Sequence, residues 1–111
     1  MAKTKAQKIR ATIDYFEQTY GSTPTLATWQ AFCRDVGVNE GNSITQCKKI
    51  LKSVNVNIVD FVSARKSGQA VTHFASRGAL ARYIQAYPKK RFPLKRAKED
   101  SFLKMLLIHL F

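Results

Sequence analysis

The sequence predicts a mainly α-helical fold, a compact bundle of five or six short helices that contains a helix-turn-helix-like pair. Apolar residues recur at three- and four-residue spacing through most of the chain. Residues that cap or end helices stand at the boundaries of these periodic segments. The chain has 111 residues and shows neither an internal repeat nor a linker-like stretch. We therefore expect one domain over residues 1–111.

The first two helices are expected at residues 4–20 and 24–36. Gly21 ends the apolar spacing of the first segment. For the second helix, Thr23 is expected to act as the cap and Pro24 to take the first helical position, where proline is favoured. Gly37 then closes the segment.

The third helix is expected over residues 43–54, with a capping box made by Ser43 and Gln46. At about 100° per residue, its apolar side chains fall on one side and its polar ones on the other. Together with the preceding helix it resembles a DNA-reading pair, although the turn "VNEGN" is longer than usual and a plain helical scaffold is the alternative. The candidate nucleic-acid contacts on this helix, in a groove, are Lys48, Lys49 and Lys52, and the candidate base contacts are Thr45 and Gln46.

Residues 54–74 allow two interpretations. As a helix, Asn57 is the cap, Asp60 lies at the third position and Gly68 ends the segment. As a β-hairpin, the alternating branched residues form two strands, and the fold becomes a winged helix-turn-helix. Its tip then offers Arg65, Lys66 and Ser67 as contact candidates. We favour the helix because its signals agree at both ends.

Two more helices are expected in the C-terminal part. Ser76 caps the first, which ends before Pro88, and Pro93 opens the second, which runs to about Leu110. From Phe102 onward the last helix is apolar nearly all round, so it is expected to be central to the core or half of a dimer contact. The inner face of the helix that begins after Ser76 is expected to carry Leu80, Tyr83, Ile84 and Tyr87.

Charge is the strongest functional signal. The formal net charge is +12, and residues 61–111 hold eleven basic and only two acidic side chains. Such asymmetry indicates a polyanionic partner, which we expect to be nucleic acid before an anionic membrane surface or an acidic protein.

The densest basic run extends from residue 87 to residue 98. Cations beside a helix start at Pro93 would be mildly unfavourable, unless a phosphate backbone occupied the site. A nuclear import signal and an ordinary solvated surface are the alternatives. In the C-terminal half the candidate phosphate contacts are Arg77, Arg82, Lys89, Lys90, Arg91, Lys95, Arg96 and Lys98, and Phe92 is the candidate for stacking on a base.

Nothing in the sequence indicates catalysis. The seven acidic residues are scattered, no phosphate-binding glycine loop is present, and the two histidines lie far apart in sequence. Cys33 and Cys47 are expected to be buried and reduced, with a disulfide as the less favoured alternative. We expect no enzyme activity, no cofactor, no metal and no transmembrane segment, and a nuclear or cytoplasmic rather than secreted protein.

The leading hypothesis is a small basic protein that binds the phosphate backbone of nucleic acid, with DNA favoured over RNA, as a DNA-binding regulator or an architectural protein. The alternative is a helical protein-interaction module that recognises an acidic partner. That alternative includes a homodimer formed through the apolar C-terminal helix.

Overall fold

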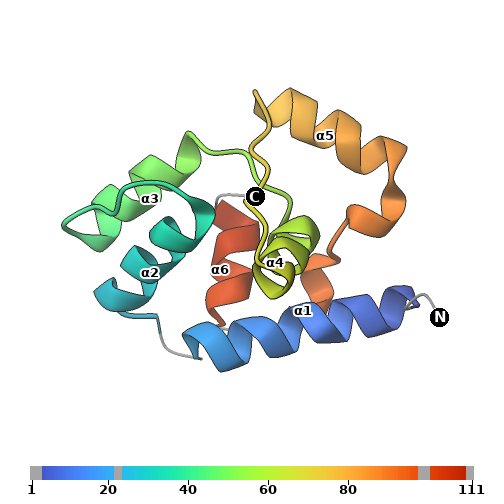
Figure 1. Ribbon diagram of the computed structural model, residues 1–111, viewed down its shortest axis with the longest axis horizontal. Helices are drawn as coiled ribbons and strands as arrows, with labels where there is room; N and C mark the ends of the chain where they lie inside the picture. Colours follow the sequence, from blue (N-terminus) through green and yellow to red (C-terminus); the bar gives the residue numbers. More distant parts are fainter. Residues whose placement is uncertain (1–3, 22–23, 98–100, 110–111) are drawn as a thin grey trace.

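A computed structural model describes residues 4–21, 24–97 and 101–109 (Figure 1). The described residues form helices and loops without a strand, and their only bridge pairs Asn55 with Phe74. The mainly α-helical prediction is therefore confirmed. The elements are α1 (Lys5–Tyr20), α2 (Leu26–Val36), α3 (Ile44–Lys52), α4 (Ile58–Ser67), α5 (Arg77–Ala86), α6 (Phe102–His109) and two short 3₁₀ helices, η1 (Pro88–Lys90) and η2 (Leu94–Arg96).

The helices are arranged along the longest, α1. Both α4 and α6 contact α1, while α2 and α3 pack against each other. The molecule measures 42 × 29 × 27 Å. Along its long axis, α3 lies at one end, and α5 with η1 lies toward the other (Figure 1).

Aromatic rings from four helices build the core. Phe61 of α4 lies 5.1 Å from Phe32 of α2, measured between ring centroids. Trp29 of α2 meets Phe102 of α6 edge-to-face at 4.9 Å. Phe16 joins α1 to this cluster, at 5.9 Å from Phe61. All five rings are buried, so α1, α2, α4 and α6 share one continuous apolar interior.

The start of α2 differs from the prediction. Thr25, two residues later than expected, is the cap: its hydroxyl accepts from the Thr28 N–H at 3.4 Å, and its own N–H donates to the Thr28 hydroxyl at 3.1 Å. This reciprocal pair satisfies backbone groups that a helix starting at Pro24 would leave to other partners. Thr23 lies outside the described residues.

The caps of the other helices agree more closely with the sequence. Thr4 and Gln7 form a full capping box on α1. At α3 half of the predicted box is present. The Ser43 hydroxyl accepts from the Gln46 N–H at 3.1 Å, but the Gln46 side-chain oxygen accepts from the Asn42 N–H at 2.8 Å instead of from Ser43.

Residues 58–67 are helical, so the hairpin alternative is wrong. The Asn57 side-chain oxygen accepts from the Asp60 N–H at 2.9 Å and caps α4. Gly68 ends the helix in the left-handed conformation, with φ of 73°, where glycine is the favoured residue. The only strand-like pairing is the single bridge between Asn55 and Phe74, so no winged helix-turn-helix is formed.

The C-terminal prediction fails at residues 93–97. Pro93 precedes one 3₁₀ turn rather than a long helix, and α6 begins only at Phe102. The backbone is extended at Ala97, with φ −74° and ψ 134°. Phe92 and Ala97 are both buried in the core. Their burial holds the segment in a shape that no continuous helix from Pro93 could adopt, because tertiary packing outweighs local propensity.

Helix α5 is peripheral. Leu80 is its one buried residue, and Tyr83 and Ile84 are half-buried. Tyr87, expected on the inner face, is 58% exposed. The α5 region is therefore attached to the core through few side chains.

Candidate nucleic-acid interface

Ion pairing divides the charged residues into two groups. Four of the five acidic side chains that the structure describes lie beside a cation, at nitrogen–oxygen distances between 2.7 and 3.2 Å. These pairs neutralise charge locally on α1, α2 and α4. They are Arg10–Asp14, Arg34–Glu40, Arg65–Asp35 and Lys90–Asp60.

The unpaired positive charge gathers in the C-terminal half. We define the C-terminal basic surface as Arg77, Arg82, Lys89, Lys90, Arg91, Lys95 and Arg96. All of them are exposed except Lys90, which is half-buried. Five of them form no ion pair with any described residue: Arg82, Lys89, Arg91, Lys95 and Arg96. Lys98, predicted as a further contact, lies outside the described residues.

Two side chains of α4 and its cap fix the middle of this surface. The buried Asn57 amide donates to the Lys90 carbonyl at 2.8 Å, while its oxygen caps α4. Asp60 accepts from the Tyr83 hydroxyl at 2.5 Å and lies 2.7 Å from the Lys90 ammonium. Burial and the bond to Asp60 raise the pKa of Tyr83 to about 12, so the phenol remains a donor at neutral pH. The basic segment around η1 is thus held in place.

The structure contradicts two predictions about this basic surface. No α-helix begins at Pro93, so no helix dipole adds to the attraction of an anion there. Phe92, predicted to stack on a base, is only 9% exposed and belongs to the core. The exposed aromatic ring of this region is Tyr87, which the sequence argument placed inside. The signal for its exposure was Pro88, since a helix that stops there leaves its last residue on the surface.

The second set of predicted contacts lies on α3. We call Thr45, Gln46, Lys48, Lys49 and Lys52 the α3 basic face. Thr45, Lys49 and Lys52 are exposed and have no internal partner among the described residues. Lys48 lies 5.3 Å from the Trp29 ring centroid in a cation–π contact, and the Gln46 oxygen is used in the cap. Three of the five side chains are thus free to contact a ligand.

The two basic surfaces are separate. The α3 basic face lies at one end of the long axis, and η1 lies toward the other end (Figure 1). Residues 37–43 connect α2 to α3, and a bond of 3.0 Å from the Gln30 amide to the Gly41 carbonyl holds this loop. The packing of α2 on α3 is shared by helical pairs of many functions and does not by itself make a DNA-reading motif.

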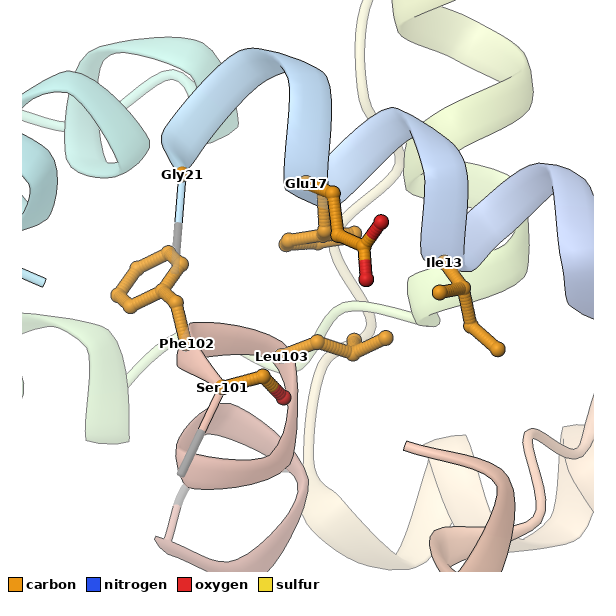
Figure 2. A pocket seen from close by; sticks show the side chains of 7 residues that line it. Ile13, Glu17, Gly21, Ser101, Phe102 and Leu103 are labelled. Carbon is orange, nitrogen blue, oxygen red and sulfur yellow. The ribbon is translucent and has the colours of Figure 1, made fainter. Parts of the chain in front are cut away.

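An apolar pocket of about 330 Å³ lies between α1 and the start of α6. Figure 2 shows Ile13 and Glu17 of α1 facing Phe102 and Leu103 across it. Among the described residues of the lining, Glu17 is the only charged one. Its negative charge and the apolar walls do not suit a phosphate group.

No histidine, cysteine, aspartate or glutamate side chains gather in a metal-binding group of three within the described ranges. None of the described helices is long and apolar enough to cross a membrane. Both cysteines are buried and free, as predicted. Comparison of the chain with protein-family models, curated proteins and solved structures gave no significant match.

Proposed function

We propose that this protein binds nucleic acid through the phosphate backbone, with the C-terminal basic surface as the main contact. The observation that carries the proposal is the set of five exposed cations that pair with no described acidic residue. Ion pairing to described acidic residues accounts for Arg10, Arg34 and Arg65 of α1, α2 and α4, but it does not account for these five. A regular polyanion would neutralise them together and release its own counterions on binding.

The α3 basic face supplies a second contact in this proposal. The long dimension of 42 Å slightly exceeds one turn of B-DNA, about 34–36 Å. Two cationic surfaces toward opposite ends suit a protein that contacts one duplex along its length or bridges two segments. We therefore favour a DNA-binding architectural or regulatory role over a role on RNA.

Fluorescence anisotropy on purified protein tests the proposal. Random duplex DNA, duplex RNA and single strands would each be titrated from about 50 to 200 mM salt. Contacts from all five unpaired cations give a slope of log affinity against log salt approaching about −4.5 on duplex DNA. Absence of binding to every strand type at the lowest salt would refute the proposal. Tighter binding to RNA would keep the phosphate contact and replace the DNA role.

The protein-interaction alternative loses part of its motivation. It rested on an apolar C-terminal helix that one small core could not cover. Phe102, Leu103 and Leu106 are nevertheless buried within the chain, and Phe102 contacts rings from α1 and α2. For these residues the apolar character of the helix is explained by the fold.

A further inference from the structure

A groove between α1 and α4 brings together three lysines that are far apart in the sequence. Lys8 comes from α1, Lys66 from the last turn of α4, and Lys90 from η1. The groove has a volume of about 280 Å³. Lys8 was not among the predicted contacts, and Lys66 was a candidate only under the hairpin alternative, because only the packing of α4 on α1 places the two lysines beside the basic run.

The charges of this groove are not balanced from within. Lys8 and Lys66 form no ion pair with a described residue. Lys8 also lies near the positive end of α1, whose first turn carries no acidic residue. Lys66 lies in the last turn of α4, where a positive charge is favourable beside the negative end of the helix. Helix stability therefore accounts for Lys66 but not for Lys8. Lysine side chains that line one hollow repel one another unless an anion offsets their charge, and only Lys90 has such a partner, in Asp60.

The rest of the lining suits a phosphate group with an apolar part attached. Ser63 is exposed, and its hydroxyl has no partner among the described residues. That hydroxyl can donate to a phosphate oxygen. Ala11, Val59 and Val62 form an apolar floor. The Thr12 hydroxyl is already bonded to the Lys8 carbonyl at 2.9 Å and adds no free donor.

Lys90 links the groove to the C-terminal basic surface. Its ammonium lies 2.7 Å from Asp60 and its carbonyl accepts from Asn57, so its position is fixed from both ends. Asp60 offsets part of its charge, which leaves Lys8 and Lys66 as the principal cations for a bound anion.

We propose that the groove between α1 and α4 is a phosphate-binding site, in which Lys8, Lys66 and Lys90 contact the anion and the Ser63 hydroxyl donates to it. The site is independent of the proposed function if the phosphate belongs to a small polyphosphate. It rests on the proposed function if the phosphate belongs to a nucleic-acid backbone, which then extends from the C-terminal basic surface across α1 and α4.

The test compares two charge-matched double variants of the full chain. Lys8→Ala/Lys66→Ala removes the two unpaired lysines of the groove. Arg10→Ala/Arg34→Ala removes the same charge from residues that are paired elsewhere. Each protein is titrated with pyrophosphate, followed by the NMR amide shifts of groove residues, and with a duplex oligonucleotide, followed by anisotropy. Circular dichroism confirms that each variant is folded.

The groove variant is expected to lose about tenfold in affinity for the ligand that wild type binds, and the control much less. If the duplex is bound, the slope of log affinity against log salt becomes less steep by about 1.8 in the groove variant, which is the contribution of two phosphate contacts. Duplex binding with equal losses in both variants overturns the groove and leaves the proposed function standing. Pyrophosphate binding that needs Lys8 and Lys66, without duplex binding, supports the groove and refutes the proposed function. Wild type that binds neither ligand overturns both.

Discussion

Two regions of this molecule use their residues in opposite ways. In the first, α1, α2, α4 and α6 bury a cluster of aromatic rings, and nearly every described acidic residue there has a cationic partner. In the second, residues 77–96 bury only Leu80 and Phe92, and five of their cations form no ion pair with a described residue. The contrast indicates that stability resides mainly in the first region, and the second is the region that we propose to bind nucleic acid.

The sharpest test of this division replaces one large side chain in each region. Phe61→Ala removes a fully buried ring that contacts Phe32, and we expect it to lower the free energy of unfolding by about 3–5 kcal/mol. Leu80→Ala, on the peripheral α5, is expected to cost about 2 kcal/mol, the low end for a buried leucine. Urea unfolding measures both values. Equal losses would contradict the division.

Asn57 connects the two regions and is expected to give the next largest effect. Asn57→Ala removes the cap of α4 and leaves the buried side of the Lys90 carbonyl without its donor. We expect a loss of about 2–3 kcal/mol. Asn57→Ser keeps a capping oxygen and loses only the reach to Lys90, so it isolates the second bond. Hydrogen exchange should then quicken around residues 88–91 while α4 stays protected, and unchanged exchange there would show that the bond does not hold η1.

Stability is expected to fall at alkaline pH because of two groups in the core. Burial is the largest cause that raises the pKa of the Cys33 thiol to about 12, and it raises the pKa of Tyr20 well above its usual value, with a further contribution from Asp35. Both groups stay protonated in the folded state, whereas in the unfolded chain each ionises above its own ordinary pKa, about 9 for the thiol and about 10 for the phenol. Each should reduce stability by about 1.4 kcal/mol per pH unit above that point.

Unfolding titrations between pH 8 and pH 11 measure this loss. Cys33→Ala should flatten the alkaline slope by one proton, and Tyr20→Phe should do the same. A free energy of unfolding that stays constant across this pH range in the wild type would show that these groups ionise within the folded protein.

The smallest effect on stability is expected at the C-terminal basic surface. Lys89→Ala/Arg91→Ala removes two exposed cations with no described ion-pair partner, so the free energy of unfolding should change by less than about 0.5 kcal/mol. A loss of several kcal/mol would place these residues in the structural region instead.

The sequence predicted local features well and the C-terminal packing poorly. Ser43, Asn57 and Ser76 cap helices as expected, because a cap depends on residues within one turn. The same local signals favoured α4 over a hairpin, correctly. The prediction of a long helix from Pro93 is wrong because the burial of Phe92 and Ala97 depends on helices that lie far away in the sequence. Local propensity contains no information about that burial.

The candidate site was predictable only in part. The excess of cations in the second half is visible in the composition, and the structure leaves most of them exposed and unpaired. The groove at Lys8 and Lys66 was not predictable, since it exists only where α4 crosses α1. Periodicity assigned Tyr87 to the interior and gave no warning that Phe92 would be buried instead.

The most direct test of the central claim is the salt dependence of duplex DNA binding by two variants of equal net charge. Lys89→Ala/Arg91→Ala removes unpaired cations, and Arg10→Ala/Arg34→Ala removes paired ones. We predict that the first variant loses about tenfold in affinity and about 1.8 in salt slope, while the second stays close to wild type. Equal losses in the two variants would mean that net charge alone drives binding, and would contradict a located site.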